Sequence, residues 1–106
     1  MIDASKDYED VHFETLRAKI DACDEQIVDL LVQRFKLVRE MGIYKTNHNL
    51  PVIDTRREGE LLSRRKEQAS GVRSELVEGI FESILDESRR IQDELRESFN
   101  ESKFDC

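Results

Sequence analysis

The 106-residue sequence has little of what a β-sheet or an irregular fold requires. It contains one proline, four glycines and no tryptophan, and it has few runs of β-branched residues. Proline and glycine interrupt helices, whereas β-branched and aromatic side chains favour strands, so this composition favours long helices. We therefore predict an all-α fold, in a single domain over residues 1–106.

The sequence also lacks the excess of positive charge that polyanionic partners require. Its formal net charge at pH 7 is -7. Because a general nucleic-acid or anionic-membrane surface needs a basic face, we expect neither nucleic acid nor membrane as a partner. The chain opens on acidic residues rather than on a signal peptide, and no apolar run has the length of a membrane span. This predicts a cytoplasmic protein.

Residues that commonly carry covalent or metal-assisted catalysis are scarce. The two histidines, His12 and His48, fall near the start of the first expected helix and in a loop, and the two cysteines are Cys23 and Cys106. No Ser-His-Asp set, glycine-rich phosphate loop or metal-ligand cluster is present. We therefore expect no cofactor and no metal, so that any catalysis would rest on electrostatic stabilisation and conformational restraint.

What the sequence does contain is apolar residues at helical spacing. Two rows at seven-residue steps are Phe13, Ile20, Ile27, Arg34 and Met41, and Leu16, Cys23, Leu30, Leu37 and Tyr44. They predict one very long helix over about residues 11–46. After a loop that contains Pro51, Asp54 is expected to cap a short second helix that stops at Gly71, and a medium-length third helix begins at about Ser74.

The length of the first helix predicts a second copy of the chain. About 35 residues at a rise of roughly 1.5 Å make a rod of about 50 Å, whereas a compact chain of this size has a radius of gyration of about 13 Å. The apolar row on that rod needs cover, most simply from a homodimer with two-fold symmetry. The polar ends, residues 1–10 and about 97–106, are expected to be flexible.

One cation, Arg34, falls within the apolar rows of the first helix. An isolated buried charge is costly, so Arg34 should face either a protein carboxylate, which would fix the register of a partner helix, or an anionic ligand. Lys45 lies three turns further along on the same side and can converge on the same small anion. Arg17 is too distant along one helix and could share that ligand only from a partner chain. Taken alone, Arg17 and Lys45 are typical of solvated charges, and Arg34 supports both interpretations equally.

Polar residues also interrupt the apolar faces of the other two helices. Arg57 and Glu58 lie one turn from a pair of core leucines in the second helix, and Ser88 and Gln92 are one turn apart on the apolar face of the third. A buried glutamine has both a carbonyl and an amide to satisfy, so Gln92 needs a polar partner. Cations, a carboxylate, an amide and a hydroxyl together predict a pocket for a small molecule with at least two negative groups.

This ordered set of residues, from Leu16 to Gln92, resembles the all-helical (type II) chorismate mutases in their stand-alone form. The pieces that carry the resemblance are Leu16 to Asp21, Asp24, Leu30-Leu31, Arg34, Gly42, Lys45, Pro51-Val52, Asp54, Arg57-Glu58, Ile80-Phe81, Ser88 and Gln92. The resemblance implies an intertwined homodimer of three-helix chains with shared active sites. It also implies an isomerase that performs the Claisen rearrangement of chorismate to prephenate, the step toward phenylalanine and tyrosine.

The resemblance further implies which residues hold the two carboxylates of the substrate. Arg34 and Arg57 would bind them within the pocket of one protomer, and Arg17 would enter that pocket from the partner protomer. Ser88 would help to hold one carboxylate.

Other residues would act on the ether oxygen and the ring hydroxyl. By the resemblance, Lys45 and Gln92 contact the ether oxygen of chorismate, and Glu58, with the backbone region of Asp54, contacts the ring hydroxyl. Lys45, Gln92, Glu58 and Arg34 are thus the expected catalytic residues.

Three alternatives to this function stay open at this point. Relatives of the same fold act as isochorismate pyruvate lyases or as 4-amino-4-deoxychorismate mutases. From another class, the chain could be a non-catalytic helical dimerisation module in which Arg34 pairs with a glutamate of the partner chain. The turn from Gly71 to Ser74 departs from the Asp-Pro pair that many relatives carry, and it lies outside the matched pocket residues.

Overall fold

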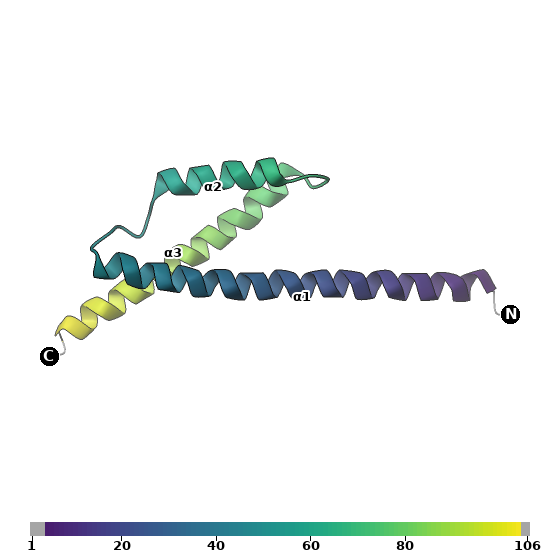
Figure 1. The fold of residues 1–106 in the computed structure, drawn as a ribbon, viewed down its shortest axis with the longest axis horizontal. Coiled ribbons are helices and arrows are strands. Elements are labelled where there is room, and N and C mark those ends of the chain that lie inside the picture. The colour runs from purple at the N-terminus through teal and green to yellow at the C-terminus, as the bar shows by residue number, and fades with distance from the viewer. Residues whose placement is uncertain (1–3, 105–106) are drawn as a thin grey trace. The chain divides into compact units, whose positions relative to one another are not determined.

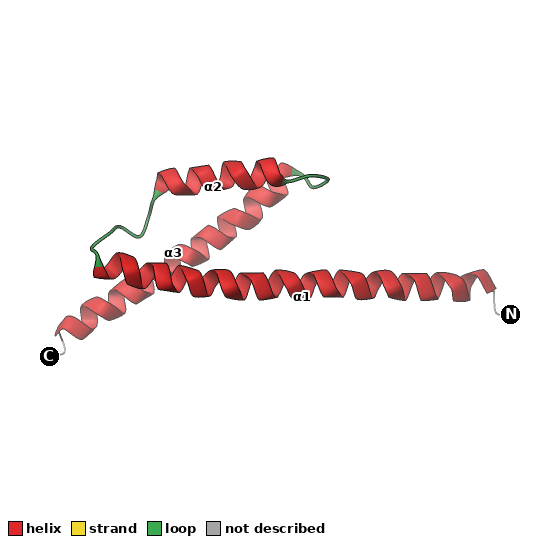
Figure 2. Cartoon of the chain, in the orientation of Figure 1, coloured by secondary structure: helices red, strands yellow, loops and turns green. Residues whose placement is uncertain are grey.

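A computed structural model of the chain describes residues 4–104, with the side chains of residues 10–102. The described residues form three helices and no strand, namely α1 (Ala4–Asn47), α2 (Thr55–Gln68) and α3 (Ser74–Phe104) (Figure 1, Figure 2). The predicted all-α class, with a very long first helix and a short second one, is confirmed. The chain divides into two compact units between Arg34 and Phe35.

The first unit consists of the N-terminal part of α1, and its apolar row lies open to solvent. More than two fifths of the surface of each of these side chains is exposed: Phe13, Leu16, Ile20, Ile27 and Leu30. Cys23, in the same row, is also exposed. Large apolar side chains gathered on one helix face mark a surface that packs against another protein element. The homodimer expected from the sequence stays a prediction that fits this exposure.

The second unit combines the end of α1 with α2 and α3. Its core is small, with Leu85 buried and the side chains of Phe81, Ile84 and Leu95 half-buried on α3. Helix α1 approaches α3 closely at Gly42. A Cβ atom built on Gly42 would lie 2.9 Å from Gln92 Cγ and 3.0 Å from Leu95 Cδ1, so the absence of a side chain there permits the contact.

A tight turn ends α1 and sends the chain toward α2. Asn49 adopts a left-handed conformation with φ of 55°, the N–H of Leu50 donates to the carbonyl of Lys45 at 2.8 Å, and the N–H of Asn49 donates to the carbonyl of Thr46 at 3.4 Å. This pair of bonds is the Schellman pattern, in which a residue at positive φ closes the last helical turn. The turn places the segment after Pro51 beside the last turn of α1.

The two ends of α2 follow the sequence prediction. Asp54 is the N-cap, because its Oδ1 accepts the N–H of Arg57 at 3.0 Å. At the other end Ala69 is the C-cap, and Gly71 adopts a positive φ of 75° in the turn that leads to α3. That conformation is readily available to glycine. The predicted cap and the predicted start of the third helix at Ser74 are therefore confirmed.

The outer ends of α1 and α3 differ from the sequence prediction. Helix α1 begins at Ala4 rather than near Val11, and α3 continues to Phe104, past the last apolar residue of its predicted face. Both extensions are rich in charged residues and contain no glycine or proline, so nothing in them ends a helix. The predicted flexibility of the ends stays a prediction, and Cys106 lies outside the described residues.

Candidate functional site

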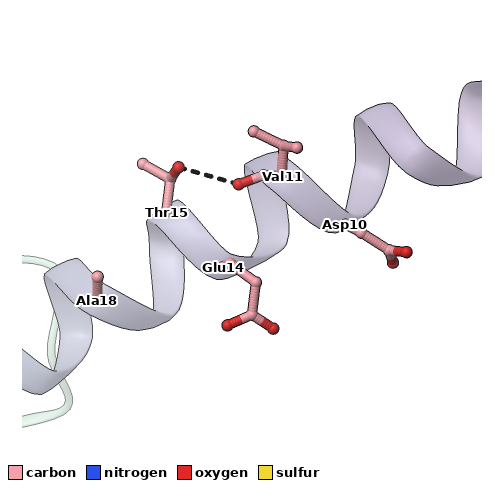
Figure 3. Close-up of a pocket in the computed structure, with 5 residues that line it drawn as sticks. All are labelled: Asp10, Val11, Glu14, Thr15 and Ala18. Atoms are coloured by element: carbon pink, nitrogen blue, oxygen red, sulfur yellow. Dashed lines mark hydrogen bonds between the residues drawn. The ribbon is translucent and has the colours of Figure 1, made fainter.

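A surface depression on the first unit does not have the chemistry of an anion site. It is formed by one face of α1 alone. Figure 3 shows the hydrogen bond that Thr15 donates to the carbonyl of Val11 there. Its two charged side chains, Asp10 and Glu14, are both carboxylates. Carboxylates repel a negatively charged ligand, so this depression does not suit an anion.

The second unit joins Lys45 of α1 to Gln92 of α3. Lys45 Nζ lies 3.2 Å from Gln92 Oε1 and donates to the carbonyl of Val52 at 2.9 Å. The amide nitrogen of Gln92 donates to the carbonyl of Val38 at 3.0 Å. Gln92 is only 6% exposed, so its amide is buried as the sequence predicted. The polar partners that this amide needs are Lys45 and the backbone carbonyl of Val38.

Local structure explains why the ammonium and the amide meet. The turn after α1 returns the chain so that the Val52 carbonyl faces the last turn of the helix, where it accepts from Lys45. Gly42 lies one turn before Thr46 on α1, and its missing side chain lets Gln92 lie against the helix. Both groups are thus fixed from two sides before any ligand arrives, which is the condition for preorganised hydrogen-bond donors.

The start of α2 contributes the carboxylate. Glu58 is half-buried, and its Oε1 lies 3.5 Å from Nη2 of Arg89 on α3. The side chain of Asp54 caps α2, so its role is structural. Arg57, in the first turn of α2, is exposed. The cap fixes the first turn of α2 and with it the position of Glu58.

Ser88 satisfies its hydroxyl within α3. Its Oγ donates to the carbonyl of Ile84 at 2.7 Å, and the residue is half-buried. This bond to the preceding turn is a common arrangement for serine in a helix.

Two of the eight predicted site residues belong to the first unit. Arg17 forms an exposed ion pair with Glu14, with 3.8 Å between Arg17 Nη1 and Glu14 Oε1, and its guanidinium lies 4.4 Å from the centroid of the Phe13 ring. Arg34 is half-buried at the end of that unit. The remaining six residues, Lys45, Asp54, Arg57, Glu58, Ser88 and Gln92, belong to the second unit.

Sequence reasoning missed several groups that complete this arrangement. The carbonyls of Val38 and Val52 hold Gln92 and Lys45, and a backbone carbonyl carries no residue-specific signal. Arg89 was also missed, although it follows Ser88 directly and lies one turn before Gln92 on α3. A glycine inside a long helix indicates close packing, so Gly42 could have predicted the contact with α3.

Among the described side chains, no three histidine, cysteine, aspartate or glutamate residues lie together as metal ligands. None of the helices in residues 4–104 is both long and apolar enough to cross a membrane.

The second unit is thus a small helical domain in which an ammonium and an amide bind each other and a half-buried carboxylate pairs with a guanidinium. The chain belongs to the chorismate mutase type II family, whose sequence model matches residues 16–93. The family resemblance recognised in the residues is therefore confirmed.

Individual relatives agree with this assignment. The chain is 41% identical over 75 residues to a T-protein of Enterobacter agglomerans, an alignment that covers 69% of this chain and 20% of that protein. It is 25% identical over 83 residues to a 4-amino-4-deoxychorismate mutase of Streptomyces pristinaespiralis, covering 76% of this chain and 64% of that enzyme. The chain thus spans about one fifth of the T-protein.

A solved structure also has this fold. The chain superposes on chorismate mutase (form II) from Thermus thermophilus with a TM-score of 0.73 at 28% identity, covering 77% of this chain and 94% of that one.

Proposed function

We propose that this chain catalyses the Claisen rearrangement of chorismate to prephenate, in the biosynthesis of phenylalanine and tyrosine. Family membership supports the reaction class. The observation that carries the proposal is the pair formed by Lys45 and Gln92, at 3.2 Å from Nζ to Oε1, with both side chains also bound to backbone carbonyls.

The pair has donors to spare for a ligand. An ammonium has three N–H bonds and a primary amide two. The hydrogen bonds of Lys45 to Val52 and Gln92 use two of the three, and the bond of Gln92 to Val38 uses one of the two. One donor from each side chain is left for a common acceptor, which in chorismate is the ether oxygen.

The reaction needs hydrogen-bond donors at the ether oxygen rather than a nucleophile or a general base. The ether C–O bond breaks as a new C–C bond forms in one pericyclic step, so no proton has to move and no nucleophile is needed. Negative charge develops on the ether oxygen, where the donors of Lys45 and Gln92 stabilise it more strongly in the transition state than in the substrate.

The remaining residues hold the substrate in its compact, reactive conformer. Arg34 and Arg57 bind its two carboxylates, Arg17 of a second protomer reaches one of them, and Ser88 assists. Glu58 accepts the hydrogen bond of the ring hydroxyl beside the Asp54 backbone. Family resemblance supports these assignments, and the half-buried carboxylate of Glu58 at the start of α2 agrees with its role.

Shared sites require a homodimer, and the exposed apolar row of the first unit supports one. Phe13, Leu16, Ile20, Ile27 and Leu30 lie along one face of α1, and a second copy that covers them would also bring its own Arg17 to the first. In this proposal catalysis therefore requires the dimer. The chain is expected to work in the cytoplasm.

One relative favours a second candidate substrate. The Streptomyces pristinaespiralis enzyme is named for 4-amino-4-deoxychorismate, in which an amino group replaces the ring hydroxyl. Glu58 could accept a hydrogen bond from either group, so the carboxylate by itself does not separate the two. An isochorismate lyase and a non-catalytic dimerisation module complete the set of functions to be distinguished.

A product assay decides among these functions. The pure chain is incubated separately with chorismate, 4-amino-4-deoxychorismate and isochorismate, and the products are identified by chromatography and NMR, because a rearrangement leaves the mass unchanged. We expect rapid formation of prephenate from chorismate. Turnover of the amino compound alone would assign the second candidate, salicylate and pyruvate from isochorismate alone would assign the lyase, and no turnover of any of the three would leave the dimerisation module.

A further inference from the structure

An ion pair ties the start of α2 to α3 beside the candidate site. Nη2 of Arg89 lies 3.5 Å from Oε1 of Glu58, across the two helices. The same nitrogen lies 2.6 Å from Oδ1 of Asp86, and Nε of Arg89 donates to the carbonyl of Leu85 at 3.5 Å. Arg89 is thus held on its own helix by two contacts while it reaches Glu58 on the other.

The burial of the three charged side chains differs in a way that assigns their roles. The side chain of Asp86 is 73% exposed, that of Arg89 38% and that of Glu58 20%. Exposed ion pairs are strongly screened and contribute little, whereas a charge near the interior is screened less. Asp86 therefore orients Arg89 from the solvent side, and Arg89 compensates the more buried charge of Glu58.

The position of Arg89 on α3 brings its positive charge close to Gln92, one of the proposed catalytic residues. Arg89 and Gln92 are three residues apart and so share one side of the helix. The negative charge of Glu58 would repel a ligand with two negative groups unless a nearby cation balanced that charge. The guanidinium supplies that balance through Oε1, so that Oε2 can accept a hydrogen bond from the ligand.

We propose that Arg89 is a positioning residue that acts through Glu58, fixing the carboxylate and offsetting its charge so that it can receive the ring hydroxyl of the substrate. The inference rests on the proposed function, because it assigns Arg89 to the same site. Arg89 itself does not touch the substrate.

The test is a double-mutant cycle on steady-state kinetics with chorismate. Arg89→Ala is expected to lower kcat/KM by about tenfold, mainly through a higher KM, because a contact made equally in the bound substrate and in the transition state affects binding more than turnover. In a Glu58→Gln background the same change should have less than about a twofold effect, since the partner through which Arg89 acts is then uncharged.

Two further variants control for charge and for folding. Arg90→Ala removes the neighbouring arginine, which forms an ion pair with Glu87 of its own helix, and should leave kcat/KM within about twofold. Arg89→Lys keeps a cation within reach of Glu58 and should restore most of the affinity. If Arg89→Ala does not fold, Arg89→Gln removes the charge while keeping a long polar side chain.

The outcomes separate this inference from the proposed function. A wild-type chain that leaves chorismate unchanged overturns both. An active wild type with Arg89→Ala and Arg90→Ala equally active overturns the role of Arg89 alone. A tenfold loss that persists in the Glu58→Gln background overturns it too, because Arg89 would then act by another route. Loss of the effect in that background, with rescue by lysine, supports it.

Discussion

Lys45 and Gln92 come from different helices and bind each other, with 3.2 Å between Lys45 Nζ and Gln92 Oε1. Each is also bound to a backbone carbonyl, that of Val52 for the lysine and that of Val38 for the glutamine. Because main-chain atoms fix both side chains, neither has to reorganise when charge develops on a ligand. Fixed donors of this kind suit the proposed rearrangement, which needs electrostatic stabilisation and conformational restraint rather than a nucleophile or a general base.

Replacing Gln92 by alanine should impair catalysis far more than stability. The change removes one of the two donors to the ether oxygen, and the loss of such a donor typically lowers kcat by about 10²- to 10³-fold. The two hydrogen bonds that it breaks within the protein are worth about 1–2 kcal/mol of unfolding free energy. Steady-state kinetics and thermal melting of the same preparation measure both. A strongly destabilised variant with near-normal turnover would contradict the assigned role.

Replacing Gly42 by alanine should displace the side chain of Gln92, which packs against α1 at this glycine. The new Cβ would lie 2.9 Å from Gln92 Cγ and 3.0 Å from Leu95 Cδ1, so one of these side chains has to move. Overpacking of this kind costs about 1–3 kcal/mol, and a shifted amide should also lower kcat. Melting and kinetics of Gly42→Ala measure the two effects.

Gly79→Ala is the matched control for that variant. Gly79 lies inside α3, and a Cβ atom built there meets nothing within 4 Å. Alanine is the better helix former, so this change should stabilise the chain by about 0.5–1 kcal/mol without affecting turnover. Equal behaviour of the two variants would mean that the contact between Gly42 and Gln92 is unimportant.

Those parts of the fold that follow from local chemistry were predictable from the sequence. Asp54 caps α2 because its side chain can accept an N–H of the first turn, and Gly71 and Ser74 bracket the next turn as their residue types favour. The outer ends of α1 and α3 were not predictable in this way, because charged segments without proline or glycine contain no stop signal.

The candidate site was predictable only in part, for a physical reason. That Gln92 would need a polar partner follows from a buried amide on an apolar face. Which carbonyls would hold it and Lys45 depends on how the turn after α1 folds back, and the sequence does not record the direction of a backbone C=O. The pairing of Glu58 with Arg89 likewise joins residues of two helices whose packing the periodicity leaves open.

Replacing Arg34 by leucine separates the enzyme from a dimerisation module. If Arg34 binds a substrate carboxylate, Arg34→Leu should leave a folded dimer whose kcat/KM is lower by about 10²-fold or more. If it instead pairs with a glutamate of a partner chain, a packed leucine should be neutral or stabilising. Sedimentation, thermal melting and the chorismate assay are measured together. A more stable dimer with unchanged activity would contradict the assigned role.

Mixing two inactive variants tests whether the sites are shared between protomers. Arg17→Ala and Lys45→Met should each be nearly inactive, since the first removes a group supplied to the partner and the second a group of the protomer's own pocket. In a mixed dimer, the pocket of the Arg17→Ala protomer keeps its own Lys45 and receives an intact Arg17, so one of the two sites is complete. Random exchange makes about half of the dimers mixed, and about a quarter of the wild-type activity should return. The pure variants set the baseline, and subunit exchange is verified with differently tagged chains. Mixed dimers that form but stay inactive would mean that Arg17 serves its own chain, whereas recovery of about a quarter would establish that a complete site takes residues from two protomers.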